Sequence, residues 1–287
     1  MKKSKFFKLN QHKKKITSQF GEDGIIQYLI KTSKIEILKT SIEFGGHDGK
    51  TNSNTYNLFK NLGFKSLLIE GDKDLFNKLN TNYGDLISIL NCYVNSTGKD
   101  SIDEIVERNE YKDFKNLGVL SIDIDSYDYY IFKHLQIKPQ IIIIEFNNSI
   151  PGHIDYTDPE GEVFIRCSAK SLQNLGFIKG YITVACTVTN VILLRTDCFD
   201  EDKHPNLPVE FLLDYEGMTE SNDILLTVMH SQMYTSKPFF TKKINKLDKI
   251  YFSLSRRLFS LFNIRKEKYI KPSDKIIYEM KKSGLYF

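Results

Sequence analysis

Two acidic residues at the ends of neighbouring apolar segments are the first positions that could do chemistry. Glu43 belongs to an apolar run that enters a glycine-rich turn containing Gly45, Gly46 and Gly49, and Glu70 ends the next apolar run. Such a turn lets a ligand approach the backbone closely. An acid at the end of the following strand can bind both hydroxyls of a ribose. This arrangement predicts a pocket for an adenosine-containing cofactor, and therefore an enzyme.

A second group of polar residues follows two later apolar segments. Asp123 and Asp125 follow one of them, and Glu145 and Asn147 end the other. Parallel strands would bring all four to one edge of a sheet, where ligands bind in open α/β folds. Carboxylates without nearby lysines favour a hard divalent cation, so we predict a Mg²⁺ site on these residues. The alternative is that one acid binds cofactor or acceptor directly and the others face water.

Other residues could complete the cofactor site, each with a structural alternative. Gln19 and Asn54 could bind the carboxylate end of the cofactor, or could cap helices instead. Asn91 and Cys92 end a predicted strand and could border an adenine ring. Asp123 is a further candidate on the cofactor side.

The two acids of the first pair also have structural alternatives. Glu43 could be satisfied by backbone donors, and Glu70 could be a surface acid before a turn. Asp72 would replace Glu70 if the strand were shifted by two residues.

A general base is needed if the acceptor is a hydroxyl group. The catalytic candidates are Asp123, Asp125 and His153, and His153 follows the segment that carries Glu145. Histidine has a suitable pKa near neutrality, although a loop histidine is commonly just solvated.

Strand-like and helix-like segments alternate along the chain, which is typical of a parallel sheet covered by helices on both faces. The last two strands are joined by a link too short for a parallel crossover and should form an antiparallel hairpin. We therefore predict a Rossmann-like, doubly wound α/β sheet, mostly parallel, that ends in this hairpin. The predicted strands are 40–44, 66–69, 87–93, 119–124, 140–146, 177–186 and 190–195, and the main predicted helices are 54–62, 73–82, 102–108, 129–135 and 168–175.

The predicted domain spans residues 16–235 and includes an insert or lid at 196–235. A solvated basic arm precedes it at 1–15, and a basic helical extension follows at 236–287. Apolar residues at helical spacing in this extension would pack on the domain or on a second subunit. The alternative is contact with a membrane surface or an acidic partner.

Composition restricts the function only moderately. The 287 residues carry a formal net charge of +4, too weak to argue for nucleic acid. The four cysteines show no CxxC spacing, so we expect free thiols in a reducing compartment and no zinc. The basic N-terminus lacks the apolar core of a signal peptide, and no apolar run is long enough to span a membrane. We expect a cytoplasmic protein.

Taken together, the motifs resemble those of S-adenosylmethionine-dependent methyltransferases, in particular an FkbM-like branch. The resemblance covers about residues 16–196 and rests on the order of SQFGEDG (18–24), IEFGGHDG (42–49), SNT (53–55), LLIEGD (67–72), LSIDIDSYDY (120–129), IIIIEFN (141–147) and GYITVACTVTNVILLR (180–195). Two departures are His47 at a position usually held by glycine and Ser126-Tyr127 where a glycine-containing turn is usual.

The resemblance implies an S-adenosylmethionine-dependent O-methyltransferase acting on a sugar hydroxyl, on a nucleotide-linked sugar or a surface glycan. A small phosphorylated metabolite is an alternative acceptor. From other classes, a non-catalytic scaffold and an NAD(P)-dependent oxidoreductase also remain, although the closing hairpin and the acid before the glycines speak against the latter.

Overall fold

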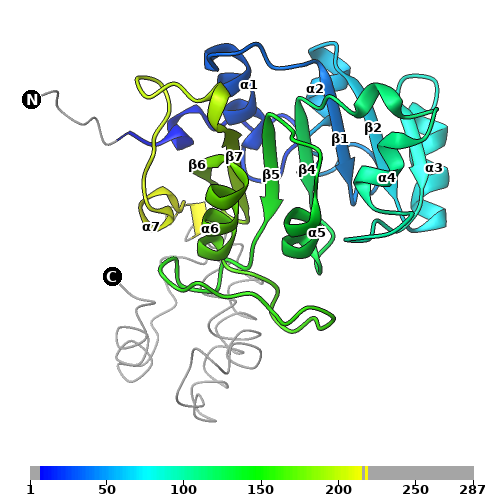
Figure 1. The fold of residues 1–287 in the computed structure, drawn as a ribbon. Coiled ribbons are helices and arrows are strands. Elements are labelled where there is room, and N and C mark those ends of the chain that lie inside the picture. Colours follow the sequence, from blue (N-terminus) through cyan, green and yellow to red (C-terminus); the bar gives the residue numbers. More distant parts are fainter. Residues whose placement is uncertain (1–6, 215–216, 219–287) are drawn as a thin grey trace, which may run out of the picture.

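A seven-stranded sheet forms the centre of the protein in a computed structural model that describes residues 7–214 and 217–218 (Figure 1). The strand order is β3-β2-β1-β4-β5-β7-β6, and β7 runs antiparallel to both of its neighbours. This is the Rossmann-like, mostly parallel sheet ending in an antiparallel hairpin that the sequence predicted. The strands are β1 (Thr40–Phe44), β2 (Lys65–Glu70), β3 (Ser88–Asn91), β4 (Val119–Ile122), β5 (Ile141–Glu145), β6 (Tyr181–Cys186) and β7 (Asn190–Arg195).

Helices cover both faces of the sheet. The isoleucines of β5 show why: Ile142 and Ile144 pack into one hydrophobic cluster, Ile141 and Ile143 into another, and all four are fully buried. A strand buried on both faces reads as a continuous apolar run. The helices are α1 (Glu22–Thr32), α2 (Tyr56–Asn61), α3 (Lys73–Tyr83), α4 (Ile102–Glu107), α5 (Asp128–His134), α6 (Ala169–Lys179) and α7 (Val209–Leu212), with 3₁₀ turns at Leu9–His12, Lys112–Phe114 and Thr196–Cys198.

The strand order decides where a ligand can bind. The chain first builds outward from β1 to β2 and β3, then returns to the other side of β1 with β4 and β5. In open α/β sheets such a reversal leaves a crevice at the carboxyl ends of the strands. In the register, Phe44 pairs with Ile69 on one side and with Ile122 on the other, so β1, β2 and β4 end at nearly the same level.

The structure corrects two boundary expectations. Residues 177–179 belong to α6, and β6 begins only at Tyr181, because Gly180 ends the helix in a left-handed conformation. The solvated N-terminal arm is also wrong for part of residues 7–15. Leu9 is fully buried, and Lys13 forms an ion pair with Asp214 at 2.6 Å.

The described part of the predicted insert packs into the main core through Val209, Leu212 and Met218. The predicted basic extension 236–287 lies outside the described residues. No helix among the described residues has the length and apolar character needed to cross a membrane.

Candidate functional site

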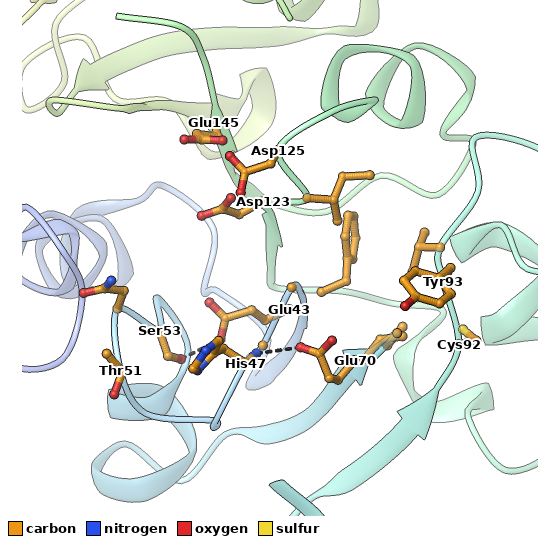
Figure 2. A pocket seen from close by; sticks show the side chains of 18 of the residues that line it. Glu43, His47, Thr51, Ser53, Glu70, Cys92, Tyr93, Asp123, Asp125 and Glu145 are labelled. Carbon is orange, nitrogen blue, oxygen red and sulfur yellow. Dashed lines mark hydrogen bonds between the residues drawn. The ribbon is translucent and has the colours of Figure 1, made fainter. Parts of the chain in front are cut away.

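A pocket of about 560 Å³ opens at the carboxyl edge of the sheet (Figure 2). It follows β1, β2, β3, β4 and β5, as expected for a ligand site at the reversal point. Most of the residues predicted from the sequence for cofactor, metal and catalysis lie here. The lining consists of Gln19, Glu43, Phe44, Gly45, Gly46, His47, Thr51, Asn52, Ser53, Ile69, Glu70, Gly71, Cys92, Tyr93, Val94, Asp123, Ile124, Asp125 and Glu145.

Gly45 is the glycine that the turn after β1 requires. Its φ is +77°, and a Cβ atom there would lie 1.9 Å from the carbonyl oxygen of Asp123. The same glycine donates its backbone N–H to Ile69 at 3.2 Å. The turn is thereby pressed between the ends of β2 and β4, a position that no side chain could occupy.

The other two predicted glycines differ in role. A Cβ atom on Gly46 would meet only Leu68 at 3.5 Å, so the fold leaves this pocket-lining position open. Gly49 lies outside the pocket lining, and a Cβ there would lie 2.4 Å from Leu79 of α3. Gly49 therefore serves the packing of α3 against the turn.

Glu70 ends β2 and points into the pocket between His47 and Tyr93 (Figure 2). Its two carboxylate oxygens accept backbone hydrogen bonds from His47 at 2.8 Å and from Asp72 at 2.9 Å. Each oxygen keeps a lone pair, so the carboxylate is fixed in place and can still accept from a ligand. Asp72, the alternative from the sequence, instead caps α3 by accepting from Asp74 and Leu75.

Glu43 is buried in β1 and is nearly saturated with donors. It accepts from the Ser53 hydroxyl at 2.5 Å, the Asn54 backbone at 2.8 Å and the Thr55 hydroxyl at 2.6 Å. Burial raises the pKa of Glu43, and these hydrogen bonds oppose the rise. The carboxylate therefore fastens the segment after the glycine turn, close to the structural alternative stated for it, while it also contributes to the pocket wall.

The second acidic group lies at the opposite end of the pocket from Glu70 (Figure 2). Asp123, Asp125 and Glu145 each offer a carboxylate oxygen, and these atoms lie within 4.8 Å of one another. Burial and the neighbouring acids raise the pKa of Asp123 to about 7 and that of Glu145 to about 9. These three residues are named the acid cluster below. The cluster holds protons at neutral pH because its charges lie close together and partly out of water.

Arg166 contacts the acid cluster and was not anticipated from the sequence. Its Nη1 donates to Asp125 Oδ1 at 3.0 Å and also to Glu145 Oε2. The guanidinium lowers the pKa of Asp123 and of Glu145 but does not overcome the effect of burial. Because 41 residues separate Arg166 from Asp125, no local sequence signal links them.

The loop between β5 and α6 holds Arg166 in place. Buried Asp158 accepts backbone hydrogen bonds from Phe164 at 2.7 Å, Ile165 at 3.0 Å and Arg166 at 2.6 Å. Arg166 itself has a φ of +67°, in the left-handed region that arginine seldom adopts. Asp158 thus fixes the bend that places the guanidinium of Arg166 against Asp125 and Glu145.

Five predicted residues lie outside the pocket lining: Gly49, Asn54, Asn91, Asn147 and His153. Asn147 uses both ends of its amide elsewhere: it donates to Ile165 at 2.9 Å and accepts from the backbone of Ser149 at 3.0 Å. Both ends being engaged, Asn147 is not available as the fourth metal ligand. Asn54 and Asn91 contact the pocket wall: the backbone N–H of Asn54 donates to Glu43, and the side chain of Asn91 donates to the backbone of Glu70. His153 is exposed in the loop after β5.

Gln19 and Cys92 do line the pocket, at its two flanks. Ser18 forms a parallel bridge with Asn52, and this bridge places the segment with Gln19 beside the chain that follows the glycine turn. Asp23 fixes that segment by accepting the backbone N–H of Ser18 at 2.8 Å. The residue that extends the Cys92 flank is Tyr93, an exposed aromatic side chain that the sequence did not single out as functional.

The acid cluster was tested as a divalent-cation site by its donor set. Three carboxylates suit Mg²⁺ in number and in type. However, Arg166 already contacts two of the three, and the predicted amide ligand Asn147 is engaged elsewhere. As it stands, the cluster does not fit a metal ion unless the guanidinium leaves.

Comparisons with known proteins give only distant structural likenesses. No family model and no curated protein matches the sequence. Among solved structures, M. capricolum TrmK in complex with S-adenosyl-homocysteine aligns over 83% of this chain and 95% of that chain, with 11% identity and a TM-score of 0.40.

Two further structures give similar values. An S-adenosylmethionine-dependent methyltransferase from Clostridium acetobutylicum aligns over 61% of this chain and 90% of that chain, with 11% identity and a TM-score of 0.38. The citrinin polyketide synthase CMeT domain aligns over 61% of this chain, with 10% identity and a TM-score of 0.38, and the chain spans about half (51%) of that structure's length. Likenesses of this strength do not decide activity or substrate.

Proposed function

We propose that this protein is an S-adenosylmethionine-dependent O-methyltransferase whose acceptor is a sugar hydroxyl. The observation that carries the proposal is the charge of the pocket. Among the described residues, its lining contains five carboxylates, from Glu43, Glu70, Asp123, Asp125 and Glu145, and neither lysine nor arginine. Such a wall favours a cofactor with a positive charge over one with phosphates.

Each end of the pocket suits a different part of this cofactor. Glu70 would accept from the ribose hydroxyls, with Cys92 and Tyr93 beside it for the adenine ring. The pocket-lining backbone of Gly45 and Gly46 would face the amino-acid end. When bound, S-adenosylmethionine supplies an electrophilic methyl group on a cationic sulfur, and the acidic wall lowers the free energy of that cation.

Asp123 is the residue we assign as general base. It lies in the pocket beside the other acids, and Arg166 contacts those two but, among the described hydrogen bonds, not Asp123. Its pKa, raised to about 7, matches a group that takes a proton from a hydroxyl near neutral pH. Asp123 would accept this proton as the acceptor oxygen bonds to the methyl carbon and the carbon–sulfur bond breaks.

The acceptor assignment rests on the acid cluster and on the resemblance of the sequence motifs. Carboxylates side by side can accept hydrogen bonds from neighbouring hydroxyl groups, as a sugar presents them. A phosphorylated acceptor is the second candidate, but Arg166, the positive charge that the described residues place at this end, is already paired with two acids. A dinucleotide would place two phosphates against an acidic wall, which argues against an oxidoreductase.

A thermal-shift titration with S-adenosylhomocysteine, with NAD as the control, tests the cofactor. Ligand at a hundred times its dissociation constant stabilises by about 2.7 kcal/mol, which we expect to appear as a saturable rise in Tm. The Glu70→Ala variant should lose this rise and keep its fold. A rise in Tm with NAD alone, or no rise with either ligand, would rule out the proposed methyltransferase activity. Screening sugars, nucleotide-linked sugars and phosphorylated metabolites with a labelled methyl group then tests the acceptor.

A further inference from the structure

We propose that Arg166 takes the place that a divalent cation would have at the acid cluster, so that the protein uses an internal guanidinium there and no metal ion. The inference concerns how the acids are neutralised and oriented. It does not depend on the identity of the cofactor or acceptor, and it departs from the Mg²⁺ site predicted from the sequence.

The acid cluster is compact enough to surround a small cation. A metal ion with oxygen ligands at about 2.1 Å holds opposite ligands roughly 4.2 Å apart. The three carboxylate oxygens lie within 4.8 Å of one another, an upper limit that includes this separation. The acid cluster therefore has the size of a cation seat, and the question is which cation occupies it.

The cation at the acid cluster is the guanidinium of Arg166. Nη1 of Arg166 donates to Asp125 and Glu145 at once, so a single nitrogen lies between β4 and β5 as a bridging ion would. The arginine side chain is mostly covered, with 24% of it exposed, and Glu145 is 12% exposed. Removing an acceptor from a mostly buried guanidinium is costly.

Hydrogen bonds within the loop before Arg166 hold this arginine at the acid cluster. The Asp158 carboxylate accepts hydrogen bonds from three successive backbone N–H groups of the loop that ends at Arg166. In the ion pair between Arg166 and Asp125, both residues have left-handed backbone, with φ values of +59° at Asp125 and +67° at Arg166. Non-glycine residues persist in this region where the surrounding structure over-determines them.

Manganese binding measured by electron paramagnetic resonance tests the inference directly, because bound Mn²⁺ loses the sharp signal of the free ion. The full-length wild-type protein should show no saturable binding up to about 1 mM Mn²⁺. The Arg166→Gln variant should bind one ion, at least about a hundredfold more tightly, because a like charge next to the ion is gone. Adding Glu145→Gln to this variant should abolish the binding.

Two controls separate occupancy from general disruption. Arg166→Lys keeps a cation near the acids and should stay free of manganese. Arg195→Gln removes an arginine that pairs with Asp197 outside the pocket lining, and should also bind no manganese. If the glutamine variant does not fold, Arg166→Gly replaces it, since glycine accepts a φ of +67° without strain.

Two results would overturn the inference. One is stoichiometric Mn²⁺ binding by the wild-type protein that Glu145→Gln removes, because the metal would then displace the arginine. The other is a folded Arg166→Gln or Arg166→Gly variant that binds no manganese, because the acids would then not form a cation seat. Neither result bears on the thermal shift with S-adenosylhomocysteine, so the failure of this inference and of the proposed function can be told apart.

Discussion

The carboxylates of the pocket fall into two groups that are held in opposite ways. Glu43 and Glu70, beside the glycine turn, accept hydrogen bonds from residues of their own neighbourhood: Ser53, Asn54 and Thr55 for the first, His47 and Asp72 for the second. The acid cluster at the ends of β4 and β5 depends on one arginine from a distant loop.

The difference shows which acids stabilise the fold and which oppose it. A carboxylate that receives several donors helps to fix the backbone around it. Acids that lie close together out of water repel one another and keep protons at neutral pH, as Asp123 does. We infer that the turn side is built to hold a ligand in a fixed place, and that the acid cluster is built to exchange a proton.

The largest expected effect is on the turn side, where Gly45→Ala forces a methyl group to 1.9 Å from the Asp123 carbonyl oxygen at a φ of +77°. We expect the free energy of unfolding to fall by about 3 kcal/mol or more, measured by urea denaturation. The matched control is Gly46→Ala, whose methyl group would meet only Leu68 at 3.5 Å and should change stability by less than about 1 kcal/mol. Equal stability of the two variants would mean that the turn is not pressed between the strands.

The next largest effect is at Glu43, where alanine would leave the donors of Ser53, Asn54 and Thr55 without their acceptor. We expect a loss of about 2–4 kcal/mol in the free energy of unfolding, because buried donors are left unpaired. Denaturation at pH 7 measures the loss. An unchanged stability would place Glu43 with the acid cluster and remove the distinction between the two groups.

Asp123→Asn should have the opposite sign. The pKa of Asp123 is raised from 3.8 to about 7 in the folded protein, so its cost to stability is absent below pH 3.8, grows as the pH rises and is complete above about 7. We expect the variant to be more stable than the wild type by about 1–3 kcal/mol at pH 8, after allowance for partial exposure, and nearly equal at pH 4. Urea denaturation at the two pH values measures this. A variant that is less stable at pH 8 would contradict the proposed repulsion.

The same titration predicts the rate. If Asp123 removes the proton of the acceptor, it must be ionised, so turnover should fall about tenfold per pH unit below a pKa near 7. A pH profile with saturating substrates measures this, and Asp123→Asn should lose turnover while it keeps affinity for S-adenosylhomocysteine. A flat profile between pH 5 and 8 would remove Asp123 as the base.

The smallest effect is expected at Asp125, whose side chain is 85% exposed although it pairs with Arg166. Exposed ion pairs contribute little, so Asp125→Asn should change the free energy of unfolding by less than about 1 kcal/mol. Denaturation in low and high salt would show the little that salt can screen. A loss in the free energy of unfolding comparable to that of Glu43→Ala would mean that the ion pair between Arg166 and Asp125 is structurally essential.

The sequence by itself determined much of this protein. The continuous apolar run at 141–144 and the alternation of strands with helices predicted a sheet buried on both faces, because these patterns depend on local periodicity. The ends of β1 and β2 were also predictable: an acid beside a glycine turn and an acid ending the next strand face one pocket, as Glu43 and Glu70 do. These positions could be predicted because each acid and the glycine turn stand at or just after a local apolar run, although the contacts they make, such as that of Glu70 with His47, join residues 23 positions apart.

Only the tertiary structure decided the use of the other acids. Asn147 is engaged by Ile165 of the loop that follows β5. In the same loop, a bend fixed by Asp158 lets Arg166 reach Asp125 and Glu145. The sequence shows carboxylates without a nearby cation, and it therefore predicted a metal ion. The countercharge comes from a residue distant along the chain, and side chains that meet only through folding leave no periodicity or spacing by which they could be found.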